Sequence, residues 1–560
     1  MRPRPPRRHI LAVVIFAAVS VTAGYFAMLD DQLSDSQVHV ATAAIKRHEP
    51  ELYPTDPIFG PAGLWKLHTP ALQGVLELTL IPTGYQDLTL PFRMLTGVSV
   101  MVYLCGMYAL LYRQCKSWSI SVFVAVLSCA VVDALGGSSW GIGSLASITP
   151  AGLVRAFIPL VMLSYLRYRR QWRAVLVFAF IGLCGNIDLI TAMNLTLVLL
   201  VVHLADGRFR PERWLSAAGC GLAALVAAAP YAGYYLSLKR SMTPADAEPA
   251  TGEAVHRALE LARPDVLYPQ LLVPLLYWLL LAGVLAVPTI IVLVRAERYR
   301  TRDGRLWVWF IAAALAVALG LHGLSQLVGS VRGRVPPVID FVRASGLVML
   351  PLYVLLAQGL TNLFRLFATQ RWLLRWACAA LLILWLGPAE NLRVPRHALA
   401  EAVTGMLEEE DKPRYVRRRR EKQNRQRELA AISRWARQNT PPSAVFLTDL
   451  LQFRMRSRRA ITASRGDLVY VFYLTPHRLG DWTERVLRQH REVHSPPAGQ
   501  AEPAAVRAYA SDLANDELMT IADEWYVIMD ANVSPIEPGQ LEPVASDDWG
   551  SSYRLYRLPQ

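Results

Sequence analysis

The chain has 560 residues, of which 53% are hydrophobic and 18% are charged, and it carries a net charge of +14. Charged residues make up about a quarter of a soluble domain, so this composition excludes an ordinary soluble protein and indicates repeated crossing of a bilayer. From residue 389 onward, 25 Lys and Arg stand against 24 Asp and Glu, so nearly all of the net charge lies in residues 1–388. In a membrane protein such basic residues mark cytoplasmic loops, and we expect no nucleic-acid partner.

The N-terminus reads MRPRPPRRH and is followed by a twenty-residue apolar run at residues 10–29. This run is long for the core of a signal peptide, and it lacks an A-x-A cleavage site. We therefore expect a retained first helix whose basic end stays in the cytoplasm.

A helix needs roughly twenty apolar residues to cross the hydrocarbon core. The loops between the apolar runs alternate, with strings such as RYRRQWR and RAERYRTRDGR on the side of the N-terminus and few basic residues on the other side. This asymmetry predicts a cytoplasmic N-terminus and a C-terminal part on the outer side. We expect about eleven spans, which begin near residues 10, 95, 117, 151, 174, 188, 213, 270, 305, 341 and 372.

The run Cys184-Gly-Asn-Ile-Asp188 leaves two topologies open. It is either the turn of a helical hairpin or a break within one long helix. In the second case the number of spans becomes even and the C-terminal part moves to the cytoplasm.

Two outer loops are long enough to be structured, at residues 30–94 and 239–269. The first contains DSQVHVATAAIKRHEPEL, in which Val38, Ala41 and Ile45 share one helical face. This spacing predicts an amphipathic helix that lies along the membrane surface.

The last 172 residues change in character. We interpret residues 389–427 as a charged helical connector and residues 428–560 as an extracytoplasmic domain in which helices and strands alternate. The predicted fold is therefore an α-helical polytopic membrane domain, residues 1–388, followed by a small α/β soluble domain. Strands are expected at residues 444–448, 468–474, 525–529 and 553–558.

Two arginines lie near the outer ends of apolar helices, Arg155 in AGLVRAFIPL and Arg343 in DFVRASGLVMLP. A guanidinium at the depth of the lipid phosphates can bind a phosphate through two hydrogen bonds. The structural alternative is that each arginine reaches up to the interface or pairs with a neighbouring carboxylate such as Asp340.

Acidic residues gather at the start of the first outer loop, where Asp30, Asp31 and Asp35 follow the first span and Asp56 comes later in ELYPTDP. A carboxylate just outside the membrane can act as general base on an acceptor hydroxyl, or it can hold a divalent cation against the phosphates of a donor. The sequence indicates no other cofactor and no specific metal. Ordinary acidic loop residues are the structural alternative.

Several short patterns resemble bacterial members of the GT-C superfamily of membrane glycosyltransferases. They are D-x3-H-x8-H-x-P-E-L-Y-x2-D at residues 35–56, R-A-F-x-P-L at 155–160, F-V-R-A-S at 341–345, W-A-x2-N-T-P-x3-V-F-L at 435–447, and F-R-x3-R-R at 453–459 with D-W-x2-R at 481–485. The order of one span, an acidic outer loop, many further spans and a C-terminal outer domain is similar as well.

The resemblance implies a multi-pass protein of the inner membrane that transfers a hexose or pentose from a polyprenyl-phosphate-linked donor to a lipid or glycan acceptor at the outer face. It implies a catalytic base among Asp35, Asp30 and Asp31, with Asp35 favoured, and phosphate contacts from Arg343 and Arg155. Relatives often show a His-Pro pair in the outer turn after the fifth span, where this chain reads CGNIDLITAMN.

Two other functions remain open from the sequence. A non-catalytic transporter or scaffold for envelope polysaccharide assembly would fit the same membrane domain, although no internal repeat is visible. A relative of the enzymes that only binds is the third reading. The expected partners are the lipid bilayer and a lipid-linked sugar donor.

Overall fold

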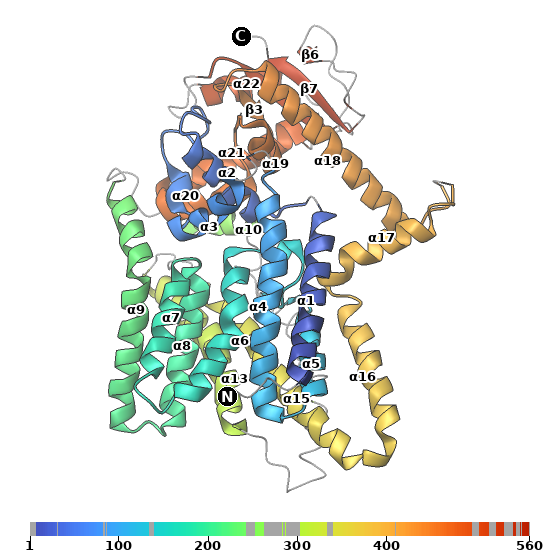
Figure 1. The fold of residues 1–560 in the computed structure, drawn as a ribbon. Coiled ribbons are helices and arrows are strands. Elements are labelled where there is room, and N and C mark those ends of the chain that lie inside the picture. Colours follow the sequence, from blue (N-terminus) through green and yellow to red (C-terminus); the bar gives the residue numbers. More distant parts are fainter. Residues whose placement is uncertain are drawn as a thin grey trace.

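The structure of the protein is a computed structural model. It is mostly helical, with a bundle of apolar helices at one end and a mixed sheet at the other (Figure 1). The residues that it describes are 7–30, 32–81, 84–85, 87–133, 139–241, 252–262, 280, 283, 286, 303–332, 340–408, 410–494, 503–514, 522–530, 541–544, 549 and 552–558.

Within these residues seven helices are long and apolar enough to cross a membrane, or eight if one sharply bent pair counts as a span. The chain is thus a multi-helix membrane protein, and the predicted number of eleven is not confirmed. The seven are α1 (Arg7–Met28), α4 (Leu90–Cys115), α6 (Pro150–Tyr168), α8 (Leu189–Asp206), α9 (Pro211–Arg240), the run of α13 (Gly304–Leu315), η6 (Ala316–Leu321) and α14 (His322–Arg332), and η7 (Phe341–Val348) with α15 (Met349–Leu366).

Two of the predicted spans are short helices in the structure. Helix α5 (Trp118–Leu127) has 10 residues and α7 (Ala174–Gly185) has 12. At 1.5 Å per residue they are about 15 and 18 Å long, well short of a hydrocarbon core of about 30 Å. The span expected near residue 270 lies outside the described residues.

The turn after Cys184 forms a helical hairpin. Helix α7 ends at Gly185, α8 begins at Leu189, and the two helices pack against each other. The Asp188 carboxylate accepts a hydrogen bond of 3.0 Å from the backbone N–H of Thr191, which caps the second helix. The segment CGNID therefore forms the turn of a hairpin and not a break within one long helix.

Close helix packing in the bundle depends on small residues. A Cβ atom at Gly182 of α7 would lie 2.2 Å from the carbonyl oxygen of Ala224 in α9, and one at Gly97 of α4 would lie 3.2 Å from the carbonyl oxygen of Ser20 in α1. Membrane helices gain little from the hydrophobic effect, so backbone contact of this kind supplies much of their association.

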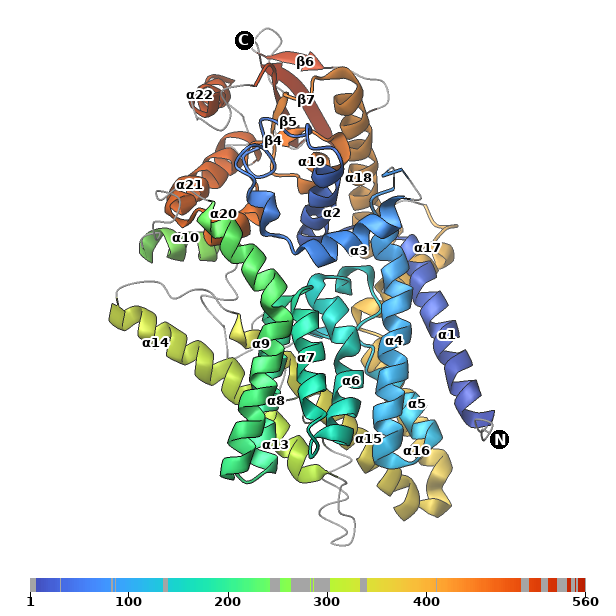
Figure 2. The same ribbon diagram turned by 60° about the vertical axis from the view of Figure 1, so that its left-hand side comes forward.

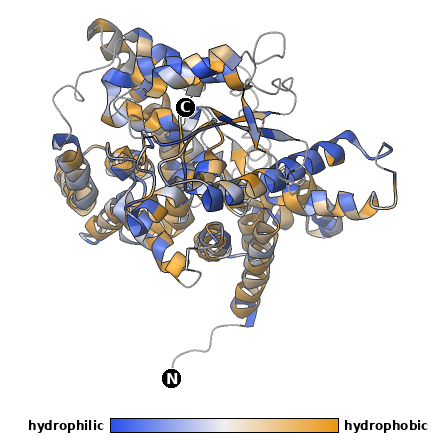
Figure 3. Cartoon of the chain, turned by 90° about the horizontal axis from the view of Figure 1, so that it is seen from above, coloured by the Kyte–Doolittle hydropathy of each residue, from blue (hydrophilic) through white to orange (hydrophobic). Residues whose placement is uncertain are grey.

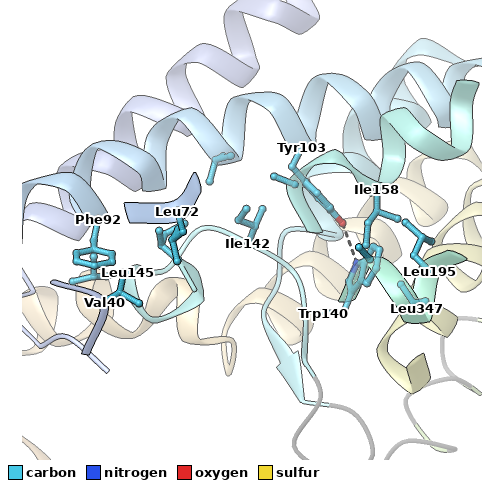
Figure 4. Close-up of a cluster of buried hydrophobic side chains, with 14 of the residues drawn as sticks. Val40, Leu72, Phe92, Tyr103, Trp140, Ile142, Leu145, Ile158, Leu195 and Leu347 are labelled. Atoms are coloured by element: carbon cyan, nitrogen blue, oxygen red, sulfur yellow. Dashed lines mark hydrogen bonds between the residues drawn. The ribbon is translucent and has the colours of Figure 1, made fainter. Parts of the chain in front are cut away.

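A hairpin of β1 (Val132–Asp133) and β2 (Ser139–Trp140) enters the bundle from its outer end. The buried Trp140 donates from Nε1 to the hydroxyl of Tyr103, at 3.0 Å, and lies among Ile142, Ile158 and Leu347 (Figure 4). Asn391 holds the same hairpin, because its Nδ2 donates to the carbonyls of Cys129 and Ile142.

Both predicted outer loops lie at the end of the bundle that carries the sheet, and α1 begins at the opposite end (Figures 1 and 2). The first loop forms a layer between the bundle and the C-terminal part. Its elements are α2 (Asp35–His48), η1 (Leu64–Leu67) and α3 (Pro70–Leu80), and the second loop contributes α10 (Gly252–Ala262), which packs on α21 (Leu479–Gln489).

The placement of α2 differs from the prediction. The helix forms where expected, but every residue from Gln37 to Ile45 is buried, including Gln37, His39 and Thr42. A surface helix keeps one face in water, whereas α2 is enclosed by the bundle and the C-terminal part. The polar positions that made it look amphipathic instead form buried contacts.

The connector and the part after it consist of helices around a five-stranded sheet. Two helices, with a turn between them, stand where one charged helical connector was expected, and residues 468–474, expected as a strand, form a helix. Besides α21, the helices of this region are α17 (Arg393–Val403), α18 (Arg414–Asn439), α19 (Leu451–Ser457), α20 (Leu468–Leu474) and α22 (Pro503–Ala514), with short helical turns η9 (Glu390–Leu392), η10 (Arg465–Asp467), η11 (Pro476–Arg478) and η12 (His490–His494). It is preceded by η8 (Ala368–Gln370) and α16 (Arg371–Leu386), and a further short turn, η4 (Leu145–Ser147), lies before α6.

The sheet has the order β4-β3-β5-β7-β6. Strand β3 is parallel to both of its neighbours, β4 and β5, whereas β7 is antiparallel to both of its neighbours, β5 and β6. Its faces alternate as strand geometry requires, so Val445 packs towards α22 while Phe446 packs towards the layer of the first outer loop. Both faces are covered, which explains the unbroken apolar run of β3. The strands are β3 (Val445–Leu447), β4 (Ala460–Ile461), β5 (Trp525–Asp530), β6 (Glu542–Val544) and β7 (Tyr553–Leu558).

The contact between α7 and α9 can be tested with two glycines. We expect Gly182→Ala to lower the free energy of unfolding by about 1–3 kcal/mol, because the new methyl group meets the α9 backbone. Gly219→Ala on α9 is the control, since a Cβ there meets nothing within 4 Å. Thermal unfolding of the purified protein in detergent measures both, and equal midpoints for the two variants would contradict the packing.

Candidate functional site

The favoured catalytic residue, Asp35, is the first residue of α2. Its side chain is exposed and makes no hydrogen bond or ion pair with the part of the chain that the structure describes. Ser34 precedes the helix, and its backbone N–H donates to Oε1 of Gln37 over 2.9 Å. The bond closes the first turn of α2, so the sequence around Asp35 fixes its backbone while the carboxylate projects outward.

Gln37 also fixes where this end of α2 lies. Its Nε2 donates to the carbonyl oxygens of Leu145 and Ile148, at 2.8 and 2.7 Å, and the side chain is fully buried. These carbonyls belong to the segment that leads into α6. Asp35 is thereby held beside the start of the helix that carries Arg155.

A small hollow separates the two helix ends. Ser36 and Gln37 line it from α2, and Thr149 and Pro150 line it from the start of α6. Asp35 directly precedes the first lining residue. Asp35 itself does not line the hollow, which lies between the starts of α2 and α6 at the end of the bundle that carries the sheet (Figure 1).

The two predicted phosphate-binding arginines already have protein partners. Nη1 of Arg155 donates to the carbonyl of Gly141 over 3.3 Å and so supports the hairpin that carries Trp140. Nε of Arg343 donates to the Asp340 carboxylate at 2.8 Å, and its Nη1 lies 3.9 Å from the Asp188 carboxylate. The side chain of Arg343 nevertheless remains 32% exposed.

The other carboxylates at the start of the first outer loop differ from Asp35. Asp30 accepts a charged hydrogen bond of 2.9 Å from Arg393, which also pairs with Glu390. This ion pair ties the end of α1 to the start of α17. Asp31 lies outside the described residues.

Asp56 is part of a buried charge network that joins the first outer loop to the C-terminal part. Arg454 of α19 lies between two carboxylates, with Nε 2.8 Å from Asp56 and both terminal nitrogens 2.8 Å from Asp467. His39 of α2 adds a contact of 3.1 Å to Asp467. The side chains of Arg454, Asp56 and Asp467 are fully buried.

The remaining bonds of Asp56 show what this carboxylate does. It accepts the backbone N–H groups of Ile58 and Phe59, each at 2.9 Å, and a longer bond of 3.3 Å from Ile461. With Arg454 these donors occupy both carboxylate oxygens, and no oxygen is left for a substrate. The prediction that Asp56 is catalytic has no support in this geometry, which makes it a structural residue.

Burial and neighbouring charges act differently on the two acids of the network. Burial raises the pKa of the Asp56 carboxyl, and this effect exceeds the opposing one of Arg454. Burial alone would also raise the pKa of Asp467, but the two bonds from Arg454 and the contact with His39 hold it at about 2. Asp467 is therefore the ionised partner of Arg454.

A second histidine of the first outer loop lies beside the network. His68 Nε2 is hydrogen bonded to the hydroxyl of Tyr470, whose ring packs edge-on against those of both His39 and His68. Burial, aided by the charge of His39, lowers the pKa of His68 to about 3, so this imidazole is neutral at physiological pH.

Sequence reasoning missed the roles of His39, Arg454 and Asp467. A signal was present for two of them, because His39 lies in the D-x3-H pattern and Arg454 in the F-R-x3-R-R pattern. The same two segments meet elsewhere, since Tyr53 donates to the carbonyl of Arg454 and Arg458 pairs with Glu49. The two patterns together thus describe one contact surface.

No group of three or more His, Cys, Asp or Glu side chains that could hold a metal ion occurs among the described residues. Asp35 is thus not part of a metal-binding group of that size in this part of the chain.

Comparisons with known proteins complete these observations. No protein family and no curated protein matches the sequence. The chain is similar to solved structures of the oligosaccharyltransferase of Archaeoglobus fulgidus. AglB in complex with an inhibitory peptide and a dolichol-phosphate matches at 13% identity and a TM-score of 0.41, over 93% of this chain and 69% of that chain.

Two further structures of that protein match to a similar degree. The complex with Zn and sulfate has 14% identity and a TM-score of 0.39 over 93% of this chain and 68% of that chain, and the apo form has 13% and 0.43 over 93% and 69%. The likeness is low in both identity and TM-score. At these TM-scores it carries no argument about what this chain does.

Removal of the central cation should be severe. We expect Arg454→Met to lower the free energy of unfolding by about 3–5 kcal/mol, because two buried carboxylates lose their counter-ion. Arg488→Met is the matched control, since Arg488 forms a partly exposed pair with Asp512 that contributes about 1 kcal/mol at most. Thermal unfolding measures both, and similar midpoints would refute the assigned role of Arg454.

The low pKa of Asp467 predicts a pH dependence. Its usual value is 3.8 and its folded value is about 2, so its stabilisation is fully present above about pH 4 and is lost as the pH falls through about 2. We expect wild type to be more stable than Asp467→Asn at pH 6 and the difference to shrink towards pH 2. Unfolding midpoints of both proteins across this range test it, and a constant difference would contradict the assignment.

Proposed function

We propose that this chain is a GT-C-like membrane glycosyltransferase that transfers a sugar from a polyprenyl-phosphate-linked donor to a lipid or glycan acceptor at the outer membrane face. The supporting observation is which acidic residues of the first outer loop form ion pairs and which one does not. Asp30 pairs with Arg393 and Asp56 with Arg454, whereas Asp35 remains exposed without a partner among the described residues.

In this proposal Asp35 is the general base. It accepts the proton of the acceptor hydroxyl as the hydroxyl oxygen attacks the anomeric carbon of the donor sugar. The bond between that carbon and the phosphate oxygen breaks, and its electron pair stays with the polyprenyl phosphate. A base for this step has to be reachable from the membrane surface, and Asp35 follows α1 by only seven residues.

Arg343 is proposed to stabilise the leaving phosphate. The side chain of Arg343 is 32% exposed, and a guanidinium can bind a phosphate through two hydrogen bonds. Arg155 has a positioning role instead, because it supports the hairpin next to the same helix end. The alternative use of Asp35, as ligand of a divalent cation, lacks further acidic or histidine ligands among the described residues.

Activity of Asp35→Asn is the decisive test. Vesicles that contain the protein are incubated with a panel of radiolabelled polyprenyl-phosphate hexoses and pentoses and with total membrane lipids and glycans as acceptors. We expect wild type to transfer label and Asp35→Asn to lose about 100-fold or more in rate, the usual contribution of a general base. Asp512→Asn, an exposed carboxylate of α22, should retain full activity.

A wild-type protein as inert as Asp35→Asn would refute the proposal. It would favour the non-catalytic reading, a transporter or scaffold in envelope polysaccharide assembly. The observation behind this second candidate is that most of the predicted site residues already have protein partners, among them Asp30, Asp56 and Arg343.

A further inference from the structure

Helices α16 and α17 meet at a sharp bend. Residues Ala368–Leu386 and Glu390–Val403 are together apolar enough to form a span, but they are inclined to each other by 81°. Most of α16 is exposed, and Trp385 is its buried residue, as expected of a helix that faces lipid. If α16 runs along the membrane normal, α17 continues within the plane of the membrane.

The depth of α17 is fixed by α1. Arg393, its first residue, pairs with Asp30, two residues after α1 ends, and the two helices are in contact. Helix α17 therefore starts where the first span leaves the bundle, and it extends sideways from there (Figures 1 and 2). This is the level of the lipid head groups.

One edge of α17 is apolar and uncovered. Leu399 and Val403, one turn apart, are 66% and 72% exposed, and the following turn exposes Met406 and Leu407. The other edge faces α18, where the ring of His397 lies 6.2 Å from that of Tyr415. Such a row of apolar side chains is unfavourable in water but suits the boundary between head groups and acyl chains.

Helix α18 supplies positive charge next to this edge. Residues 414–427 contain eight Arg and Lys and one acidic residue, Glu421. Arg417, Arg420 and Arg427 line a hollow of about 650 Å³ between α17 and α18, opposite Glu401. Seen from above, the hydrophilic α18 and the mixed α17 project together from one side of the molecule (Figure 3).

Acidic residues act against an anionic ligand here. The turn between the helices carries Glu408, Glu410 and Asp411, all exposed, and Glu401 lies 3.8 Å from Arg419. Glu401 of α17 and Glu421 of α18 also line the hollow, so acidic side chains lie on both helices as well as in the turn. Neutralising the acids of the turn is a variant whose expected effect is opposite to that of removing the arginines.

We infer that the α17–α18 hairpin, residues 393–427, is a docking surface for anionic phospholipid head groups. The apolar edge of α17 lies among the acyl chains, and the arginines of α18 bind the lipid phosphates above it. Charge alone would suit any polyanion. The apolar edge at head-group level favours the lipid.

Spin-labelled lipids provide a direct test with the full-length protein. The protein is reconstituted in phosphatidylcholine vesicles with a trace of spin-labelled phosphatidylglycerol or phosphatidylcholine, and the immobilised fraction of each label is measured. We expect wild type to prefer phosphatidylglycerol, since one basic residue near an anionic surface contributes about fivefold in affinity. The preference should weaken as salt rises from about 0.1 to 1 M.

The preference for phosphatidylglycerol is then compared among variants that differ in charge. Replacing Arg417, Arg418, Arg420 and Arg427 by Gln should reduce the preference at least about tenfold, replacing them by Lys should preserve it, and neutralising Glu408, Glu410 and Asp411 should strengthen it. The matched control replaces four arginines of the C-terminal part by Gln, namely Arg488, Arg491, Arg507 and Arg557, and should leave the preference unchanged.

Three results would overturn the inference. They are an unchanged preference in the Arg→Gln variant of α18, an equal loss in the matched control, and displacement of the lipid by heparin as effectively as by phosphatidylglycerol, which would make the hairpin a general polyanion surface. Unfolding midpoints of all variants, compared with wild type, separate a loss of binding from a loss of folding, and the Arg→Lys variant repeats the test in a folded protein if the Gln variant fails to fold.

Discussion

The arrangement of this protein depends on one buried cation. Arg454 carries its charge out of water and is held there by Asp56 of the first outer loop and by Asp467 of the C-terminal part. Each charge alone would be too costly to bury, so the three side chains are stable only when both parts of the chain are docked. The buried charges are therefore paired only when the first outer loop and the C-terminal part, which are separated by most of the sequence, pack against each other.

This constraint is transmitted to the candidate site through α2. His39, in the second turn of the helix, contacts Asp467, and Gln37, two residues earlier, attaches the start of the helix to the carbonyls before α6. Helix α2 is thus fixed on one side by the C-terminal part and on the other by the bundle. The position of the Asp35 carboxylate follows from contacts that are themselves buried and rigid, which is how a reactive group on a surface is usually held in place.

The sequence predicts what depends on local pattern and fails where distant partners decide. Apolar length and basic loops locate the bundle helices, and the unbroken apolar run of β3 predicts a strand. The run LVYVFYL at residues 468–474 has the composition of a strand but forms α20, because its neighbours in space are η1 and α10 from other parts of the chain. The contact between Asp56 and Arg454 could not be predicted for the same reason, because the two residues are 398 positions apart in the sequence.

Two arginines of similar appearance in the sequence differ in what they can do. Arg454 is fully buried and donates three hydrogen bonds of 2.8 Å to two carboxylates, so loss of a partner would cost several kcal/mol. Arg343 is 32% exposed, and its close partner Asp340 is 8% exposed. The proposed function therefore assigns the leaving phosphate to Arg343 and not to Arg454. Exposure to solvent, more than charge, separates a residue that holds the fold from one that can meet a substrate.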